Sequence, residues 1–530
     1  MNRSSLWHIK QAYYLLSVLI NKTMKTIIFS LFLLNVLFLS ACGDKSEATP
    51  DIVPPTVIEG TNLSQFSFLR ENNPDLDNDI DLVIDNNFIT GRITTNIKVD
   101  SLIATFSHDG AEIIVNDVVQ NNSSTTNDFT DIVTYTVKTS DGIEESYQVD
   151  LTKFTGLPIV YLSTDNNAAI DSKEDYVEGN VTLDGGRTTD SLPSTWMKIR
   201  GRGNSTWGIH PKKPFQMKFD DKTEFLGMPA DKKWLFLAEY SDKTMLRNTI
   251  AFEMGYISQL DWTPQSAFAE VYINNEYNGT YNISQKVEES NNRVALGDTG
   301  YLLEIDQLDR LDADDVYFYT DSFLINIKEP NLDLGSTEYH YVKDLINEFE
   351  TALYSSQFKD PASGYAKFID MDSFIDWYLI SEITKNVDSK FFSSIYLNVM
   401  PGEKIKMGPL WDFDLSFGNV DYADSQYADG FWVKDHPWYT RLFQDPAFVN
   451  KINERFAYFR NNQNYILDKI EQKAEALKWA QQENDNKWHT IGMYVWPNPI
   501  VFGSYDEEVV HLKDWYTRRM NWLETAFSNL

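Results

Sequence analysis

Two acidic residues separated by a single residue, Asp412 and Asp414, belong to the segment Trp-Asp-Phe-Asp that begins at Trp411. In an extended segment, successive side chains point to opposite faces, so this spacing would put both carboxylates on the same face. Two like charges held together need a compensating cation, and Mg²⁺ bound through carboxylates and phosphate oxygens meets that need. The spacing therefore predicts a divalent-cation site at these two residues.

A second polar pair, Asn386 and Asp388, follows a helix that apolar periodicity predicts over residues 371–385. A short strand is expected at residues 394–397, before the acidic segment. A helix end carrying Asn and Asp, then a strand, then a metal-binding Asp is the layout of a kinase catalytic centre. In such a centre one residue orients or deprotonates the acceptor hydroxyl, and another holds the metal.

Arginine and glycine alternate in residues 200–203, after an expected strand, and Asn204 follows them. Glycine lets a backbone approach a ligand closely, and arginine pairs with phosphate oxygens. The segment matches neither a Walker loop nor a dinucleotide fingerprint. A phosphate site and a plain hairpin turn, with its arginines paired to nearby acids, are equally compatible with this pattern.

Residues 211–219 have the alternation of a strand, and Lys218 would project from one of its faces. A helix expected over residues 249–260 carries Glu253. A strand lysine paired with a helix glutamate is how protein kinases hold nucleotide phosphates. Both side chains could equally be solvated surface charges.

The elements that must position these residues change in type along the chain. Strands are expected first, and helical spacing follows. The expected strands are residues 159–162, 181–183, 211–219 and 233–238, with a hairpin of 270–273 and 280–283; the clearest later helices are 339–354 and 371–385. This order predicts an α+β domain from residue 157 to 530.

A smaller all-β region is expected at residues 61–154. Short alternating strands, such as residues 113–115 and 134–137, are separated by turn signals that include Asp141-Gly142. This pattern predicts an immunoglobulin-like β-sandwich and resembles the Ig-like modules of many secreted Bacteroidota proteins. No residue in it names a ligand, so a spacer is favoured over a glycan-binding or protein-binding module.

The N-terminus has the pattern of an export signal. A basic start at Met24-Lys25, a short apolar run and small residues end directly before Cys42, which resembles a bacterial lipobox. The resemblance implies a signal segment over residues 1–42, with Met24 as the conventional start, and lipidation of Cys42. The alternative is a buried anchor helix with an incidental cysteine. Residues 43–60, rich in charge, Thr and Pro, are expected to form a flexible tether.

Composition limits the classes of partner. The 530 residues exceed one ordinary core and predict two or three domains. The chain carries 46 basic and 78 acidic residues, a formal charge of −32, which argues against nucleic acid and against broad contact with anionic lipid. Contact with a membrane is therefore expected only through a lipid anchor, which would place the protein at the bacterial outer membrane or cell surface.

Six motifs in order resemble the spore coat protein H (CotH) kinase family. They are Arg-Gly-Arg-Gly-Asn-Ser-Thr-Trp (200–207), Lys-Lys-Pro-Phe (212–215), Leu-Gly-Met (226–228), Leu-Arg-Asn (246–248), Gly-Tyr-Leu-Leu-Glu (300–304) and Gly-Pro-Leu-Trp-Asp-Phe-Asp (408–414). The resemblance implies an atypical protein-kinase-like fold that binds ATP with Mg²⁺ or Mn²⁺ and phosphorylates Ser or Thr of a protein. The chain has no GxGxxG loop, no His-Arg-Asp and no Asp-Phe-Gly, so ordinary kinase geometry cannot be assumed.

The resemblance also implies roles for particular residues. Asp388 and Asp412 are the candidate catalytic residues; Asp412, Asp414 and Asn386 are candidate metal ligands; Arg200, Arg202, Asn204 and Lys218 are candidates for contact with ATP phosphates. Trp411 is a candidate for stacking on adenine, with a buried core tryptophan as the alternative.

Two classes of function remain open. The first is a secreted kinase that acts on a surface or co-exported protein. The second is a non-catalytic surface scaffold, associated with protein or polysaccharide, in which the same acids could form a structural Ca²⁺ site. Retention of Asp388, Asp412 and Asp414 favours the enzyme, because a scaffold has no need for clustered carboxylates.

Overall fold

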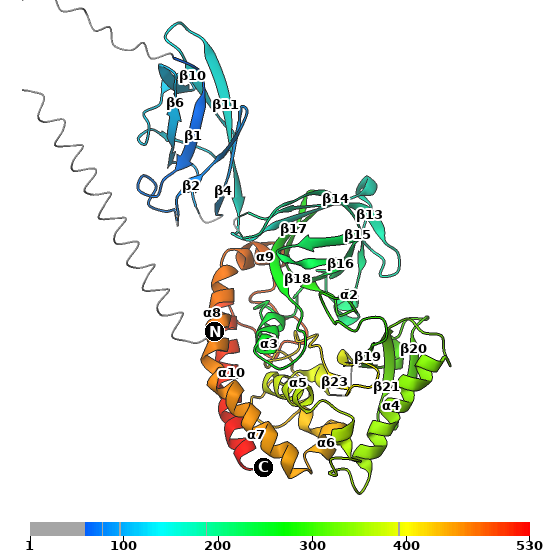
Figure 1. Cartoon of the computed structure of the whole chain (residues 1–530). Helices are drawn as coiled ribbons and strands as arrows, with labels where there is room; N and C mark the ends of the chain where they lie inside the picture. The colour runs from blue at the N-terminus through cyan, green and yellow to red at the C-terminus, as the bar shows by residue number, and fades with distance from the viewer. Residues whose placement is uncertain (1–58, 77, 95–96, 187, 391–392) are drawn as a thin grey trace, which may run out of the picture. The chain divides into compact units, whose positions relative to one another are not determined.

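The computed structural model describes residues 59–76, 78–94, 97–186, 188–390 and 393–530 (Figure 1). From Thr61 onward these residues belong to one compact unit of the chain. The expected signal segment, Cys42 and nearly all of the expected tether lie outside the described residues, so their assignment stays a prediction. Within the described part of the chain, no helix combines the length and the apolar composition needed to cross a bilayer.

The first described region is all-β, as its alternating sequence predicts. One sheet has the strand order β2 (Ile80–Asp81), β1 (Leu63–Phe68) and β6 (Thr105–His108). A larger sheet has the order β3 (Val83–Asp85), β4 (Phe88–Thr94), β11 (Glu144–Phe154), β10 (Val133–Lys138), β7 (Glu112–Val115) and β8 (Val118–Val119). A small sheet pairs β5 (Leu102–Ile103) with β9 (Thr126–Asn127). One apolar core forms inside this region, with Phe66, Phe68 and Tyr135 among its buried aromatic residues. The immunoglobulin-like assignment of this region stays a prediction.

Seven strands then close into a barrel. Their order is β12 (Ile159–Thr164), β13 (Val177–Asp184), β14 (Leu192–Gly201), β15 (Phe215–Phe225), β16 (Met228–Leu237), β18 (Glu276–Gln285) and β17 (Ser266–Ile273). A parallel pairing of β12 with β17 completes the closure. The strand expected from residue 211 begins at Phe215, because Pro214 and Pro211 have no N–H to donate to a ladder.

Alternation along the barrel strands places apolar side chains in the barrel interior. Met197 and Ile199 of β14, Met217 of β15 and Trp234 of β16 are buried in the barrel core. The predicted hairpin forms between β17 and β18, but its turn is shorter than expected. Asn274 and Asn275 alone connect the strands, with φ of 52° and 68°.

The rest of the chain combines a second sheet with helices. The sheet has the order β20 (Val316–Tyr319), β21 (Leu324–Glu329), β19 (Tyr301–Asp306), β22 (Ile395–Val399) and β23 (Lys406–Met407). The main helices are α3 (Arg247–Tyr256), α4 (Thr337–Tyr354), α5 (Met371–Thr384), α6 (Pro437–Leu442), α7 (Pro446–Asn461), α8 (Gln463–Ala476), α9 (Ala480–Trp488) and α10 (Tyr505–Ser528). The mixture of helices and sheets confirms the predicted α+β class.

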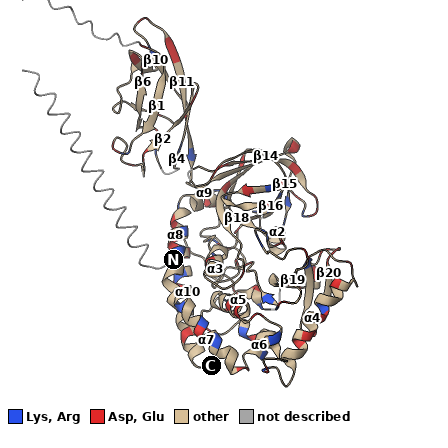
Figure 2. Cartoon of the chain, viewed as in Figure 1, with Lys and Arg blue, Asp and Glu red and all other residues tan. Residues whose placement is uncertain are grey.

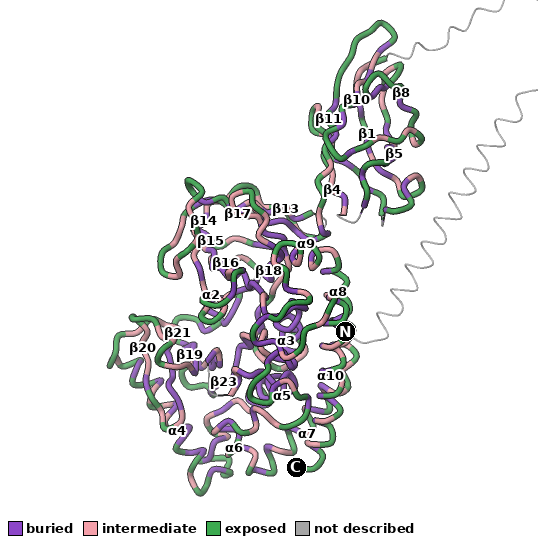
Figure 3. The backbone as a smooth tube through the Cα atoms, turned by 180° about the vertical axis from the view of Figure 1, so that it is seen from behind, coloured by how far each residue is buried: buried purple, intermediate pink, exposed green. Residues whose placement is uncertain are grey.

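Helix α5 lies at the centre of this region (Figure 3), and its residues from Ser373 to Thr384 are all buried. The Asp370 side chain accepts a hydrogen bond from Ser373 N at its start, and Lys385 ends it in the left-handed conformation. Leu235 and Leu237 of β16 belong to the same apolar core as α5. The outer face of the barrel is thereby joined to the helices, and α5 leads directly into Asn386 and Asp388.

A buried ion pair ties the last helix to α5. Arg519 of α10 contacts Glu382 of α5 at 2.6 Å, and both side chains are fully buried. The guanidinium also donates to the backbone oxygens of Ala428 and Gly430. The carboxylate of Glu382 accepts hydrogen bonds from Trp432 N and Lys434 N. The network therefore anchors α10 and the loop around residue 430 on the helix that precedes Asp388.

Arg519→Met is expected to lower the free energy of unfolding by roughly 3–5 kcal/mol, because it leaves the Glu382 carboxylate buried without its cation. Urea denaturation followed by tryptophan fluorescence measures the change. Arg518→Met is the matched control, since Arg518 is exposed and pairs with Asp514 one helical turn away. Its expected change is below about 0.5 kcal/mol. Similar losses in both variants would contradict the role given to the buried pair.

Candidate active site

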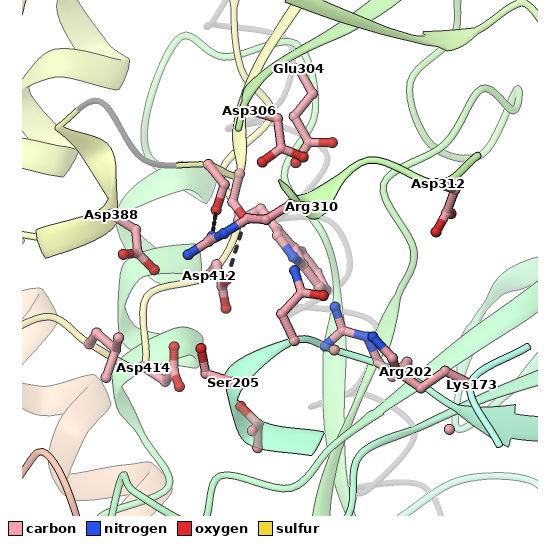
Figure 4. A pocket seen from close by; sticks show the side chains of 18 of the residues that line it. Lys173, Arg202, Ser205, Glu304, Asp306, Arg310, Asp312, Asp388, Asp412 and Asp414 are labelled. Carbon is pink, nitrogen blue, oxygen red and sulfur yellow. Dashed lines mark hydrogen bonds between the residues drawn. The ribbon is translucent and has the colours of Figure 1, made fainter. Parts of the chain in front are cut away.

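A cavity of about 460 Å³ lies between the barrel and the five-stranded sheet (Figure 4). Its volume falls within the range typical of small-ligand sites. Most of its lining comes from the end of β14 with α2 (Ser205–Ile209), from β19, and from residues 393–396 and 411–415. Both acidic and basic side chains face it, so the cavity can hold an anion and a cation together.

Asp388, Asp412 and Asp414 all line this cavity, although they come from two separate chain segments. Burial raises the pKa of Asp388 to about 7, with a further contribution from the Asp412 charge and an opposing one from Arg310. Burial, followed by the Asp412 charge, also raises the pKa of Asp414 well above its usual range. The carboxylates are thus close enough for their charges to repel one another.

Two asparagines fix the segments that carry these acids. Asn386 donates from Nδ2 to Asp412 O at 3.0 Å, and its Oδ1 accepts from Asp388 N at 3.3 Å. Asn248 of α3 accepts from Phe413 N at 2.7 Å. These contacts give Asn386 a positioning role, outside the lining of the cavity. Its assignment as a metal ligand stays an untested prediction.

The expected extended segment at residues 411–414 does not form, so that prediction is wrong. Strand β23 ends at Met407, and Asp412 has a φ of 64°, in the left-handed region that non-glycine residues seldom adopt. The Ser394 hydroxyl donates to Asp412 Oδ2 at 3.3 Å. Both carboxylates reach the cavity through this turn and not through strand alternation. Unusual backbone of this kind recurs at functional sites.

A second acidic pair, Glu304 and Asp306, enters the cavity from β19. Burial raises the pKa of Glu304 to about 7, and the charge of Lys328 opposes that rise. Lys328 belongs to the neighbouring strand β21, and its Nζ lies 3.7 Å from the Glu304 carboxylate. Sequence reasoning gave these residues no function, although Glu304 closes one of the six motifs. Acidic residues at alternate positions of an otherwise apolar strand were the available signal.

Basic and amide side chains also line the cavity, some of them beside the acids. Arg200, Arg202 and Asn204 line it, as expected from the sequence, and so do Arg310 and Lys173. Figure 4 places Arg310 between Asp306 and Asp412, with Arg202 farther along the wall. Arginine forks of this kind suit phosphate oxygens. The cavity therefore offers anion-binding groups beside a cluster of carboxylates.

Trp411 belongs both to the apolar core and to the cavity wall. Its ring stacks on Phe252 at a centroid distance of 6.4 Å, and the Arg202 guanidinium lies 5.7 Å from its centroid. The side chain is 7% exposed. The core interpretation of this residue is thus correct, and the adenine contact stays a prediction.

The expected pair between Lys218 and Glu253 does not form. Lys218 lies on the outer face of the barrel, away from the cavity lining. Glu253 of α3 instead contacts Lys469 and Lys473 of α8, at 3.7 Å and 3.1 Å. Helix α3 turns this side chain toward α8 because the helix packs there. The predicted kinase-like pairing of Lys218 with Glu253 is therefore wrong. The basic residues of the cavity are instead Lys173, Arg200, Arg202, Arg310 and Lys328.

The acidic side chains of the cavity fit one mode of binding a divalent cation. Among the residues that the structure describes, no three His, Cys, Asp or Glu side chains gather at metal-binding spacing. Mg²⁺ is usually held by one or two carboxylates together with waters and substrate phosphates. Asp412 and Asp414 fit that mode, because both carboxylates line a cavity that has room for phosphates beside them.

A protein-family model matches more than half of the chain. The model of the family described as CotH kinase protein matches residues 199–523. No curated protein matches the chain. A crystal structure from Bacteroides fragilis, named as a secreted protein, is 15% identical with a TM-score of 0.14 and covers 18% of this chain and 96% of its own. Another from Bacteroides thetaiotaomicron, named as a glycoside hydrolase, is 13% identical with a TM-score of 0.16 and covers 56% of this chain and 89% of its own.

Asp414→Asn is expected to stabilise the protein in metal-free buffer by roughly 1 kcal/mol, because it removes one of several buried like charges. Thermal unfolding in EDTA at pH 8 measures the change as a higher Tm. Asp435→Asn is the control. Because the Asp435 side chain is 68% exposed, the Tm of this variant should equal that of the wild type. A lower Tm for Asp414→Asn would mean that the carboxylate is satisfied within the protein and has no need of a cation.

Proposed function

The chain belongs to the CotH kinase protein family, and from this we propose that it is an atypical protein kinase. It would transfer the γ-phosphoryl group of ATP to a Ser or Thr hydroxyl of a secreted or surface protein. The observation that carries the proposal is the convergence of Asp388 with Asp412 and Asp414 in one cavity that also holds arginines. The chain supplies these groups from segments that are far apart in sequence.

Each group has a role that its surroundings support. Asp388, with a pKa raised to about 7 by burial, is suited to accept the proton of an acceptor hydroxyl near neutral pH. Asp412 and Asp414 would hold Mg²⁺ or Mn²⁺, which when bound neutralises charge on the phosphoryl oxygens. Arg202 and Arg310 line the cavity where the phosphates of ATP would lie.

The reaction balances with these residues. The acceptor oxygen forms a bond to the γ-phosphorus, the bond from that phosphorus to the β–γ bridging oxygen breaks, and ADP leaves. The proton of the hydroxyl passes to the carboxylate of Asp388. Asn386 and Asn248 keep the acidic segments in place while charge moves.

The location of the protein is part of the same proposal. The signal pattern before Cys42 supports a lipid-anchored protein at the bacterial outer membrane or cell surface, with residues 43–60 as its tether. The β region before residue 157, with its own apolar core, suits an immunoglobulin-like spacer between the anchor and the catalytic domain. On this view the membrane is contacted only through the lipid.

A non-catalytic scaffold bound to protein or polysaccharide is the second candidate. The observation that favours it is the number of acids in the cavity, since Glu304 and Asp306 join the three aspartates there. Carboxylate oxygens in this number suit a structural Ca²⁺ ion, which needs six to eight oxygen ligands and no nucleotide.

Transfer of radiolabelled γ-phosphate from ATP by the purified protein tests the first candidate. Asp388→Ala and Asp412→Ala are each expected to lower the rate at least about a hundredfold, because proton transfer or metal binding is lost. Asp220→Ala, at an exposed position of β15, is the control and should keep the wild-type rate. ATP with Mg²⁺ should also raise the Tm of the wild type and not that of Asp412→Ala.

A rise in Tm with Ca²⁺ alone, no response to ATP and no transferred label would support the scaffold and contradict the kinase. Retention of label transfer in Asp388→Ala would refute the role given to that residue.

A further inference from the structure

Four lysines stand side by side across the outer face of the barrel. Lys198 of β14 is directly opposite Lys218 of β15, which is directly opposite Lys233 of β16. Lys286 follows Gln285, the residue of β18 that pairs with Trp234, and therefore continues the row beside Lys233. We call these four residues the lysine row. Basic segments of the barrel are visible around β15 and β16 in Figure 2.

Strand alternation puts the lysine row outside the barrel. The residues next to Lys198 and Lys218, among them Ile199 and Met217, are buried in the barrel core. The side chains of Lys233 and Lys286 keep 29% and 33% of their surface exposed. All four lysines are partly exposed, so a ligand that approaches from solvent can reach the row.

The lysine row destabilises the folded protein through repulsion between like charges. Like charges directly opposite one another on neighbouring strands are destabilising. Burial lowers the pKa of Lys218, and the charges of Lys198 and Lys233 lower it further. Burial, followed by the charge of Lys233, lowers the pKa of Lys286 to about 8. A chain with 78 acidic and 46 basic residues has ample acids to separate these lysines, yet it places them together.

Acidic residues stand at both ends of the row: Glu178 of β13 is directly opposite Lys198, and Glu288 lies beside Lys233 and Lys286. Glu288 lies 2.9 Å from Lys233 and 3.7 Å from Lys286, and Arg293 shares the same carboxylate. For Lys198 and Lys218 no ion pair exists within the described ranges. Lys198 instead lies 5.4 Å from the centroid of the Tyr176 ring. At the β14–β15 end of the row, Lys218 therefore has neither an ion pair among the described residues nor an acid directly opposite it.

That end of the row adjoins the catalytic cavity. Arg200 lies two residues beyond Lys198, on the same face of β14, and lines the cavity. At the other end, the charge of Lys328 acts on Lys286, and Lys328 also lines the cavity. A ligand bound along the row would therefore lie beside the part of the cavity that Arg200 and Lys328 line.

The dimensions of the row suit a polypeptide. Neighbouring strands are about 4.8 Å apart, so four lysines span about 14 Å, the length of about four residues of extended chain. Lys198 and Lys218 do not line the cavity, where the phosphates of ATP have their own arginines. The strongly acidic remainder of the surface would repel an acidic ligand elsewhere and direct it to this row.

We propose that the lysine row docks an acidic segment of the substrate polypeptide, so that the preferred acceptor is a Ser or Thr flanked by a run of Asp and Glu. The substrate class rests on the proposed kinase function, whereas docking itself does not require catalysis.

Fluorescence anisotropy of the full-length protein with a labelled peptide, one Ser flanked by six alternating Glu and Asp residues, tests docking. The double variant Lys198→Ser/Lys218→Ser should weaken binding about tenfold or more, and added NaCl should weaken wild-type binding. The Tm of this double variant should equal or exceed that of the wild type, because repulsion among the lysines of the row is relieved. The control Lys404→Ser/Lys451→Ser removes the same charge at exposed positions and should change affinity less than about twofold.

The outcomes separate docking from catalysis. Binding that depends on the row, without any label transfer to the peptide, supports docking and contradicts the kinase. Label transfer that is equal for the acidic peptide and its Gln/Asn counterpart, in both wild type and double variant, overturns docking and leaves the kinase standing. Tighter row-dependent binding of a sulfated polysaccharide, or full displacement of the peptide by inorganic triphosphate, overturns the assignment to an acidic polypeptide.

Discussion

Repulsion among buried carboxylates is the constraint on which the rest of the structure depends. Asp388, Asp412 and Asp414 share one cavity, and burial raises the pKa of the first and the third. Left to themselves, such groups would move apart or draw in water. Their present arrangement persists because the surrounding chain fixes the backbone that carries them. The same repulsion makes the cavity a place where a cation brings a gain in free energy.

The fixing groups come from elements on several sides. Asn248 of α3 holds the segment around Phe413, and Asn386 links the two aspartate-bearing segments. Behind them, α5 is buried on all sides and is locked to α10 through Arg519 and Glu382. The chemistry of the cavity therefore depends on the last helix of the chain, although that helix contributes nothing to its lining. In the same way, the barrel contributes Arg200 to the cavity while its own core lies elsewhere.

The sequence predicted element types well where a periodic pattern decides them. Helices α4 and α5 form within two residues of expectation, since their apolar spacing and their N-caps act locally. The order of Asp388 and Asp412 along the chain also placed them correctly in one cavity. Strand alternation predicts which face of the strand Lys218 projects from, but it does not predict which element packs near that face. The predicted pairing of Lys218 with Glu253 was therefore wrong. The left-handed turn at Asp412 depends on contacts with distant residues, which no local pattern records.

The parallel pairing of β12 with β17 has a consequence for how the protein reaches its folded state. Ile159 and Glu270 pair across most of the barrel sequence, and this pairing is the seam that closes the ring. Every other neighbour in the barrel is antiparallel, and most are joined by short connections, so those contacts can assemble as the chain emerges. Until β17 is available, β12 exposes an open edge able to recruit strands from other chains. Nascent or truncated molecules that lack the seam would thus expose this edge, which the complete barrel covers.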